Sequence, residues 1–369
     1  MTPGYRIAFF GSSLVSSYWN GAATYYRGII RALNQSGIHV TFFEPEAYER
    51  QKHRDIPDPP WATVRIFRAE PQAMMRALEE AQSANLIVKA SGMGIFDEDL
   101  EQLIPEIRRP GSQVAFWDVD APATLDRIAS NPVDPFRAVI PRYDVIFTYG
   151  GGESVVHAYR QAGAQRCIPI YNALDETTHR PVPPDPRFEG DLAFLGNRLP
   201  DREERVENFF FKAAEKLSEK KFLLGGNGWD TRTVPPNVKR LGHVYTSDHN
   251  AFNCTPRAVL NINRESMARY GFSPATRIFE AAGAGACIIT DAWKGIDHFL
   301  EPNEEILVAK DGEEVAMYLE GLSAADAARI GCKARARILA HHTYSRRALQ
   351  VIEALDELPN RSSLETAPA

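Results

Sequence analysis

The chain has 369 residues and a net charge of −6, and 44% of its residues are hydrophobic and 24% charged. This length is more than one ordinary hydrophobic core supports, so we expect two domains, and the composition is that of a soluble globular protein. The acidic balance argues against a general nucleic-acid binder, because phosphate backbones require a basic surface. No apolar run reaches the roughly 18–20 residues of a membrane span. The start of the chain carries no export signal, so we expect a cytoplasmic protein.

The four cysteines lie far apart in the sequence and form no C-x-x-C pair. Their spacing predicts neither a zinc site nor a redox motif, and it suits a reducing compartment. Cys167 and Cys287 stand in apolar runs and are expected in the core.

Residues 1–174 alternate short apolar runs with segments of helical periodicity. Strands alternating with helices imply right-handed crossovers and a parallel sheet, so we expect one Rossmann-like domain here. The expected strands are 5–11, 39–45, 85–91, 113–120, 143–150 and 166–174, and the expected helices are 21–37, 71–84, 97–109, 122–130 and 154–163.

The proline-rich segment 175–190 interrupts this alternation and is expected to be an interdomain linker. A second Rossmann-like domain is expected over 191–340. A C-terminal helix over 341–358 can pack back on the first domain, and the polar tail 359–369 is expected to be disordered. The expected strands of the second domain are 191–197, 220–226, 238–244, 258–264, 287–291 and 304–310, with helices at 202–219, 312–322 and 324–340. The predicted fold class is α/β, with two doubly wound domains in tandem facing a cleft.

Ligands of such sheets bind beyond the carboxyl ends of the strands. In the first domain Gly11 ends the first strand, and Asn20 and Gly21 open a helix whose free N–H groups could face an anion or a sugar. The alternative is an ordinary strand–helix turn. The nicotinamide fingerprint G-x-G-x-x-G is absent from this stretch.

Asp118 and Asp120 in "FWDVDAPAT" stand at another strand end of the first domain. They can act as catalytic or ligand-orienting carboxylates, or one can cap the following helix while the other is solvated. A D-x-D pattern also holds a divalent metal in some transferases. No other acidic cluster stands nearby to complete such a metal site.

Two strand ends of the second domain are rich in glycine, in "FLGNRLPDR" and "LLGGNGWD". Such loops can bind phosphate through backbone N–H groups, and Arg198 could add a positive charge. The candidate residues of these loops are Asn197, Arg198, Gly225, Gly226, Asn227 and Gly228.

The stretch "SPATRIFEAAGAGACIITD" places Arg277 and Glu280 three residues apart, which puts them on one face of a helix. The two side chains can form a structural ion pair, or they can hold a polar ligand. The sequence pattern leaves both interpretations open.

The second domain resembles the nucleotide-sugar-binding half of GT-B glycosyltransferases, and in particular the CgeB-like (spore maturation protein) branch of the group 1 family. The resemblance rests on "LAFLGNR", "FLLGGNGW", "VKRLGHVYTSD", "AVLNINRES", "ATRIFEAAGAGACIITD" and "FLEPNEEILVAKDGEE", in that order. The stretch "YWNGAATYYRGIIRALNQSGIHVTFFEP" resembles the start of the first domain in such proteins. The resemblance covers most of residues 5–355.

This resemblance implies roles for several residues. Glu280 would bind the ribose hydroxyls of the nucleotide, because a carboxylate accepts two hydroxyl hydrogen bonds well. Arg264 and Arg277 would offset the charge on the leaving diphosphate. Arg198 and the loop 225–228 would lie near phosphate, and the nucleotide base would lie near His243, Val244 and Tyr245. GT-B enzymes generally work without a bound metal, so no metal is expected.

One position departs from the family pattern. Many retaining GT-B enzymes carry a first glutamate that touches the donor sugar, and Phe272 stands at that position here. The sugar contact is then changed, or another side chain such as Tyr270 or Arg264 supplies it. The stereochemical outcome therefore stays open.

The expected function is transfer of a sugar, of the hexosyl type, from a UDP-, GDP- or dTDP-sugar to an unknown acceptor. No cofactor is expected beyond this donor, and the oligomeric state is not predicted. If the reaction inverts, Asp118 and Asp120 are the candidate bases. The alternatives are a sugar-nucleotide-binding protein without turnover and a GT-B-type sugar-nucleotide epimerase.

Overall fold

The computed structural model describes residues 4–18 and 20–358, which form two compact units. Unit 1 combines the chain up to Tyr171 with the C-terminal part from Tyr344, and unit 2 is Asn172–Thr343. Each unit is built on its own parallel sheet with helical crossovers, so the predicted α/β, doubly wound fold class is confirmed. The predicted disordered tail 359–369 lies outside the described residues.

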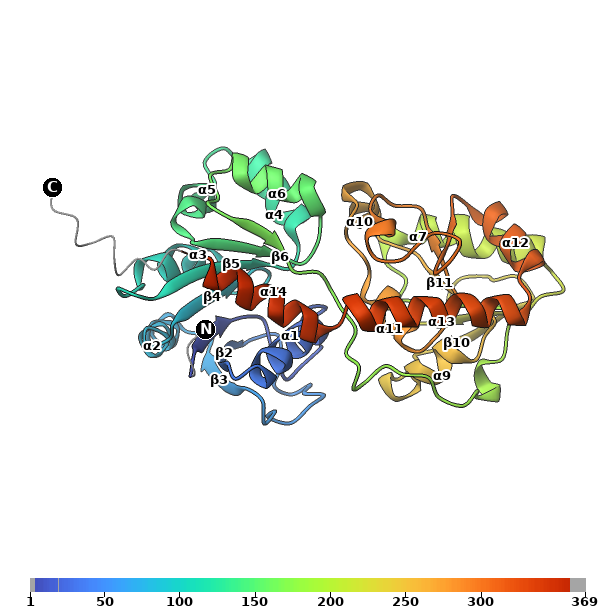
Figure 1. Ribbon diagram of the computed structural model, residues 1–369, viewed down its shortest axis with the longest axis horizontal. Coiled ribbons are helices and arrows are strands. Elements are labelled where there is room, and N and C mark those ends of the chain that lie inside the picture. Colours follow the sequence, from blue (N-terminus) through green and yellow to red (C-terminus); the bar gives the residue numbers. More distant parts are fainter. Residues whose placement is uncertain (1–3, 19, 359–369) are drawn as a thin grey trace. The chain divides into compact units, whose positions relative to one another are not determined.

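Unit 1 contains a seven-stranded parallel sheet in the order β3-β2-β1-β4-β5-β6-β7 (Figure 1). The central strand β4 is buried along its whole length, as expected for a parallel strand that is covered on both faces. The strands are β1 (Arg6–Phe10), β2 (His39–Glu46), β3 (Thr63–Arg68), β4 (Leu86–Ala90), β5 (Gln113–Asp118), β6 (Val145–Thr148) and β7 (Cys167–Pro169). The helices are α1 (Ala23–Gln35), α2 (Pro71–Ala81), α3 (Asp97–Glu106), α4 (Ala121–Ser130), α5 (Pro135–Val139), η1 (Ile140–Arg142), α6 (Gly152–Gln161) and α14 (Tyr344–Asp356).

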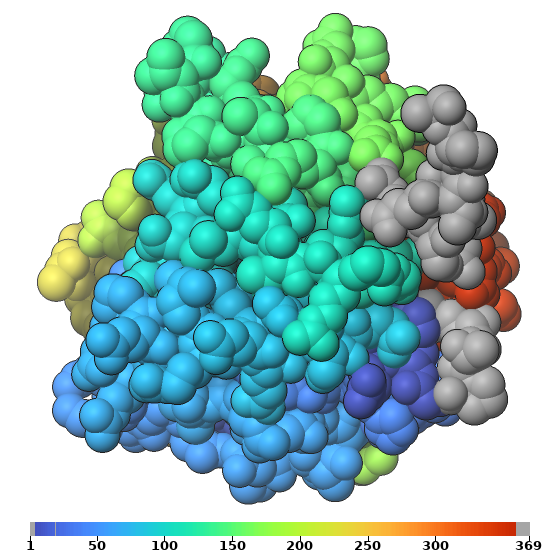
Figure 2. Space-filling model, turned by 90° about the vertical axis from the view of Figure 1, so that its left-hand side faces the viewer, coloured from blue at the N-terminus to red at the C-terminus, as the bar shows by residue number. Residues whose placement is uncertain are grey.

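The order of the strands reverses between β1 and β4, which creates a topological switch point at the carboxyl edge of this sheet. Figure 2 shows one face of the molecule, on which the blue residues of the first half of unit 1 lie below the green residues of its later half. From β1 the chain moves outward to β2 and β3, then crosses back to β4 beside β1 and continues outward to β7.

The C-terminal helix α14 lies along α1 within unit 1 (Figure 1). A Cβ atom at Gly28 of α1 would lie 2.2 Å from the ring of Tyr344, so the close approach of the two helices requires a glycine. The Tyr344 ring also contacts Tyr25 edge-on, at 6.1 Å between centroids. The last helix is therefore part of the core of unit 1, although it is far from the other elements in sequence.

Unit 2 contains a six-stranded parallel sheet in the order β10-β9-β8-β11-β12-β13. Its strands are β8 (Leu192–Leu195), β9 (Phe222–Gly225), β10 (Val238–Gly242), β11 (Ala258–Asn261), β12 (Ile288–Asp291) and β13 (Leu307–Ala309). Its α-helices are α7 (Pro200–Val206), α8 (Lys212–Lys216), α9 (His249–Cys254), α10 (Glu265–Tyr270), α11 (Thr276–Gly283), α12 (Gly312–Gly321) and α13 (Ala324–His341). The shorter turns are η2 (Pro186–Phe188), η3 (Glu207–Phe211), η4 (Thr246–Asp248) and η5 (Ile296–His298).

Several elements differ from the sequence prediction. The expected helix 202–219 contains a π-helical turn, η3, which buries three consecutive phenylalanines. All three rings belong to the hydrophobic core of unit 2. Strand β3 was not expected, because its residues are mostly exposed and carry little apolar periodicity. Strand β11 ends at Asn261, so Arg264 lies in the loop beyond it.

The proline-rich segment 175–190 packs along unit 2. The Thr178 carbonyl accepts a bond of 2.9 Å from the Asn250 amide, and Asp248 pairs with Arg187 at 2.8 Å. The ring of Phe188 contacts Phe252. The expectation of a linker overlooked these contacts, because proline density reports the loss of regular structure but not the presence of side-chain partners.

Among the described residues, no helix is both long and apolar enough to cross a membrane.

Gly331→Ala is expected to destabilise unit 2 by about 2 kcal/mol, a typical cost of overpacking. A Cβ atom at this position of α13 would lie 2.1 Å from the Gly285 carbonyl oxygen, and a backbone atom cannot move aside as a side chain does. Gly321→Ala in α12 is the matched control, because nothing lies within 4 Å of its Cβ position. Urea unfolding should show a lower midpoint for the first variant alone, and equal midpoints would contradict the predicted clash.

Candidate functional site

The loops that follow β8 and β9 interlock at the carboxyl edge of the sheet in unit 2. Gly226 has a φ of 116°, and a Cβ atom there would lie 2.2 Å from the Gly196 carbonyl oxygen. The Asn227 backbone N–H donates to the Asn197 side-chain oxygen at 2.9 Å, and the Trp229 indole N–H donates to the Gly196 carbonyl at 2.8 Å. The glycines that the sequence singled out therefore allow these two loops to approach each other closely. Gly225 is buried and would clash with Leu195 if it carried a Cβ atom.

Arg198 stands in this pair of loops, but it is engaged within the protein. Its guanidinium pairs with Glu203 at 2.5 Å and donates to the Thr231 hydroxyl at 3.3 Å. Its backbone N–H bonds to Asn227. The Gly228 Cβ position lies against Arg198, which explains the third glycine of this loop.

Helix α11 carries Arg277 and Glu280, which the sequence places on one face of a helix. The Nη1 atom of Arg277 is buried and has no hydrogen-bond partner in the described part of the chain. Burial lowers the pKa of Arg277, and the negative charge of Glu280 opposes this effect only in part. A buried guanidinium nitrogen without a partner is costly, because it has lost its water and gained no acceptor. The interpretation as a structural ion pair therefore leaves Nη1 unexplained.

Arg202 lies within electrostatic range of both Arg264 and Arg277. Burial lowers the pKa of Arg202, and the positive charges of Arg264 and Arg277 act in the same direction. Arg202 donates to the Asn197 carbonyl at 2.7 Å, and its buried Nε atom has no partner among the described residues. Arg264 pairs with the exposed Asp201. Three cations next to one another, with two buried nitrogens unsatisfied, form a site that would gain from an anion.

The Glu280 carboxylate lies close to two histidines. Its Oε1 atom lies 3.9 Å from Nε2 of His179, and potential ligand atoms of His179, His249 and Glu280 all lie within 4.8 Å of one another. The side chains of His179 and Glu280 are only 8% and 14% exposed. His179 comes from the proline-rich segment and His249 from the start of α9, so three distant parts of the chain converge here.

The predicted base-binding residues lie between β10 and η4. His243 and Tyr245 are exposed, and their rings meet edge-on at 4.7 Å. Val244 is buried, and its backbone hydrogen-bonds the His249 ring. The segment is therefore connected directly to the His179/His249/Glu280 cluster.

Tyr270 ends α10, and Phe272 stands in the turn between α10 and α11. The Arg269 guanidinium lies 5.4 Å from the centre of the Tyr270 ring. Phe272, at the position of the missing glutamate, has a φ of 45°, and its N–H donates to the Lys294 carbonyl at 2.7 Å. A left-handed conformation is unfavourable for phenylalanine, so packing against residues 294 and 295 holds this turn in a strained form.

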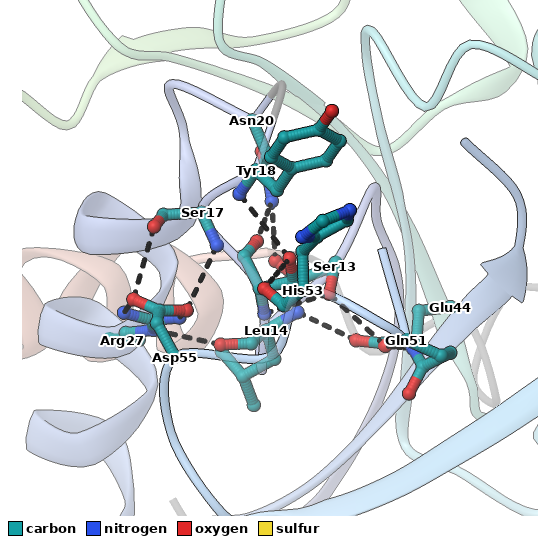
Figure 3. A network of polar contacts seen from close by, with 11 residues as sticks. Ser13, Leu14, Ser17, Tyr18, Asn20, Arg27, Glu44, Gln51, His53 and Asp55 are labelled. Carbon is teal, nitrogen blue, oxygen red and sulfur yellow. Dashed lines mark hydrogen bonds and ion pairs between the residues drawn. The ribbon is translucent and has the colours of Figure 1, made fainter. Parts of the chain in front are cut away.

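The first-strand loop of unit 1 is held by its own side chains (Figure 3). The Asn20 amide donates to the Ser13 and Ser16 carbonyls at 2.7 and 2.9 Å and accepts from the Ser12 hydroxyl. Helix α1 begins at Ala23, so the expectation that Asn20 and Gly21 open the helix is wrong. The short polar side chain bonds to its own loop instead, which delays the start of the helix.

Two carboxylates complete this loop (Figure 3). Glu44 is fully buried and accepts from the Leu14 N–H at 2.7 Å, and Asp55 forms a bidentate pair with Arg27 at 2.7 and 2.9 Å. Burial raises the pKa of Glu44. Gly11 lies against Phe42, where a Cβ atom would be 2.5 Å from the ring, and Gly21 lies in open space. These contacts explain Gly11 and Asn20 by packing and loop closure.

Asp118 is fully buried at the end of β5. It accepts hydrogen bonds from the Ser91 hydroxyl at 2.7 Å, the Thr124 hydroxyl at 3.1 Å and the Tyr159 hydroxyl. It also accepts from the Asp120 N–H at 3.0 Å. Burial raises the pKa of Asp118. With every contact made inside the protein, this carboxylate organises the loop after β5.

Asp120 is exposed and directly precedes α4. Within the residues that the structure describes, its side chain makes no capping hydrogen bond to that helix. The helix-capping alternative is therefore not realised by Asp120, and the carboxylate is open to solvent. Asp118 positions it through the bond to its backbone N–H.

Sequence reasoning missed Arg202, His179 and His249. Arg202 stood in an ordinary charged helix start, and His179 stood in a segment interpreted as a linker. No local pattern marks either histidine, because their significance comes from proximity to Glu280 in space. The one usable signal was the proximity of Arg202 to the glycine-rich loop at 196–198.

Comparison with known proteins adds two findings. Residues 202–353 match a family model described as glycosyl transferase-like, which spans α7 to α14. No curated protein is significantly similar to the chain.

Several solved structures share the fold at low sequence identity. Sucrose-phosphate synthase from Thermosynechococcus elongatus is 16% identical with a TM-score of 0.69, and the match covers 96% of this chain and 99% of that one. HepE from Anabaena, solved with UDP and glucose, is 14% identical with a TM-score of 0.67, covering 96% and 100%. An alpha-glucosyltransferase solved with UDP and a 13-mer DNA is 13% identical with a TM-score of 0.64, covering 96% and 100%. The chain thus has the GT-B fold of glycosyltransferases, with a glycosyl transferase-like segment over residues 202–353.

Proposed function

We propose that this protein is a GT-B glycosyltransferase that moves a sugar from a nucleotide diphosphate sugar to an acceptor. The observation that carries the proposal is the buried, unpartnered Nη1 of Arg277 beside Arg202 and Arg264. A diphosphate supplies the acceptor oxygens that these nitrogens lack, and it gains negative charge as the glycosidic bond breaks. The glycosyl transferase-like match and the shared fold support this proposal. The CgeB-like branch and hexosyl transfer belong to the same proposal.

Unit 2 would hold the donor. The diphosphate would lie against Arg277 and Arg202, and Glu280 would accept hydrogen bonds from the ribose hydroxyls. The exposed rings of His243 and Tyr245 would offer a surface for the base. The turn at Tyr270 and Phe272 would lie toward the sugar.

Unit 1 would hold the acceptor and the base. Of the two candidate carboxylates, Asp120 is open to solvent and Asp118 is enclosed. We therefore assign Asp120 as the general base of an inverting transfer, taking the proton of the acceptor hydroxyl as the new glycosidic bond forms. Asp118 is a positioning residue for this carboxylate.

Thermal melting with UDP, GDP, dTDP and their sugars tests the donor site. One nucleoside diphosphate is expected to stabilise the protein by about 2.7 kcal/mol at 100-fold excess over its Kd. Glu280→Gln is expected to weaken that nucleotide about tenfold, because the amide loses one acceptor and the charge. Glu313→Gln, at an exposed position of α12, is the matched control and should bind the nucleotide as tightly as the parent protein does.

Hydrolysis of the best donor separates an enzyme from a binding protein. Slow release of free sugar from the nucleotide sugar, lost in Glu280→Gln, supports a transferase. Binding without any hydrolysis or transfer favours the non-catalytic alternative. Absence of binding by every nucleotide would contradict the assigned donor site.

A further inference from the structure

Potential ligand atoms of His179, His249 and Glu280 lie around a small common space. No two of the three atoms are further apart than 4.8 Å, and His179 Nε2 and Glu280 Oε1 are separated by 3.9 Å. A separation of 3.9 Å is too long for a direct hydrogen bond between these two groups. The His179 and Glu280 atoms therefore lie close together without bonding directly to each other.

The size of this space distinguishes between two kinds of occupant. A triangle with edges of at most 4.8 Å has a point no further than about 2.8 Å from every corner, which is the length of an O–H···O hydrogen bond. A tetrahedral zinc ion with ligands at about 2.0–2.1 Å holds its donor atoms about 3.4 Å apart. The 3.9 Å separation is wider than this, and the positive charge of Arg277 acts on both His249 and Glu280. Hydroxyl oxygens fit the space better than a metal ion does.

The hydrogen-bonding capacity of the cluster matches a pair of hydroxyls. One nitrogen of the His249 ring bonds to the backbone of Val244, so in the neutral ring the other nitrogen is an acceptor. Burial and the charge of Arg277 lower the pKa of His249, which keeps this ring neutral. The Thr178 hydroxyl lies 2.9 Å from Nδ1 of His179 and orients that ring. When this hydroxyl donates, Nε2 of His179 carries the ring proton and can donate to a ligand oxygen.

We infer that His179 and His249 act with Glu280 to bind the ribose hydroxyls of the donor, so that the site prefers ribonucleotides to 2′-deoxyribonucleotides. This inference rests on the proposed function, and it assigns two further specificity-determining residues to the donor site. His249 accepts from the 2′-hydroxyl and His179 donates to the same oxygen, while Glu280 accepts from the 3′-hydroxyl. A 2′-deoxy donor, such as a dTDP-sugar, leaves part of this buried set unsatisfied.

Isothermal titration with UDP, GDP and their 2′-deoxy analogues, in buffer containing EDTA, tests the inference. The parent protein is expected to bind its preferred ribonucleotide at least about tenfold more tightly than the 2′-deoxy form. Losing a hydrogen bond to a buried polar group lowers the affinity by about this factor. His179→Phe and His249→Phe keep a planar ring but remove the nitrogens, and each should reduce this ratio to about threefold or less. Binding of the 2′-deoxy nucleotide should change little in both variants, which shows that the pocket is still folded. His157→Phe, on the exposed surface of α6, is the matched control and should keep the parent ratio.

Several outcomes would overturn the inference. Equal binding of both forms by the parent protein removes the ribose preference while the proposed function stands. If both histidine variants still prefer the ribonucleotide, Glu280 alone is responsible for that preference. A preference present without EDTA but lost with it points to a metal ion held by the three side chains. Absence of binding by any nucleotide would contradict the proposed function as well.

Discussion

Arg277→Met is expected to weaken nucleoside diphosphate binding about 100-fold and to raise the free energy of unfolding by about 1 kcal/mol. The two effects have opposite signs for one reason. The buried Nη1 atom has no partner among the described residues, so the free protein bears a desolvation cost that the diphosphate would relieve. Methionine keeps much of the apolar stem and removes this cost together with the anion contact. Titration with the preferred nucleotide and urea unfolding measure the two quantities on the same sample.

Arg329→Met is the matched control for the Arg277 variant. Arg329 lies on the exposed surface of α13 and forms ion pairs with surface carboxylates, so its replacement makes the same change in net charge. Nucleotide affinity should stay within about twofold of the parent value, since surface substitutions away from a site have small effects. If Arg277→Met instead unfolds unit 2 and binding is unchanged in the folded fraction, the guanidinium is structural and the proposed diphosphate site is wrong.

Asp120→Asn is expected to lower transferase turnover at least about 100-fold without changing stability by more than about 0.5 kcal/mol. The exposed carboxylate makes no capping bond that the amide would lose, within the described residues. Donor binding should be unchanged, because the donor residues belong to unit 2. Initial rates with a competent acceptor, together with titration of the nucleotide, check both parts of this expectation.

Asp118→Asn serves as the paired variant, and here the main expected effect is a loss of stability. The buried carboxylate accepts four hydrogen bonds, and an amide cannot accept at its NH₂ group, so at least one buried donor is left unsatisfied. We expect a loss of about 3 kcal/mol in unfolding free energy. Full stability with abolished turnover in Asp118→Asn, and normal turnover in Asp120→Asn, would reverse the assigned roles.

The fold of both units could be predicted from the sequence because its signals are local. Buried parallel strands such as β8 appear as continuous apolar runs, and the intervening helices show amphipathic spacing. Glycines at 226 and 228 mark positions with positive φ, which few other residues adopt. The same local signals led to the candidate donor residues at the ends of these strands.

The character of the site depends on contacts between residues that are distant in sequence. Asp118 and Asp120 look equivalent in "FWDVDAPAT", and only the packing of Tyr159 and Ser91 encloses the first and leaves the second in solvent. His179 stands in a segment whose prolines predict irregular structure, and its position beside Glu280 follows from the packing of that segment on α9.

The sequence by itself determined the α/β class, the helix that carries Arg277 and Glu280, and the glycine-rich strand ends, because propensity and periodicity act over a few residues. Only the tertiary structure decided that Arg277 Nη1 is unsatisfied, that Glu280 faces two histidines and that Asn20 closes its own loop. Burial and hydrogen-bond satisfaction are properties of the surroundings of a side chain, and those surroundings come from elements far along the chain.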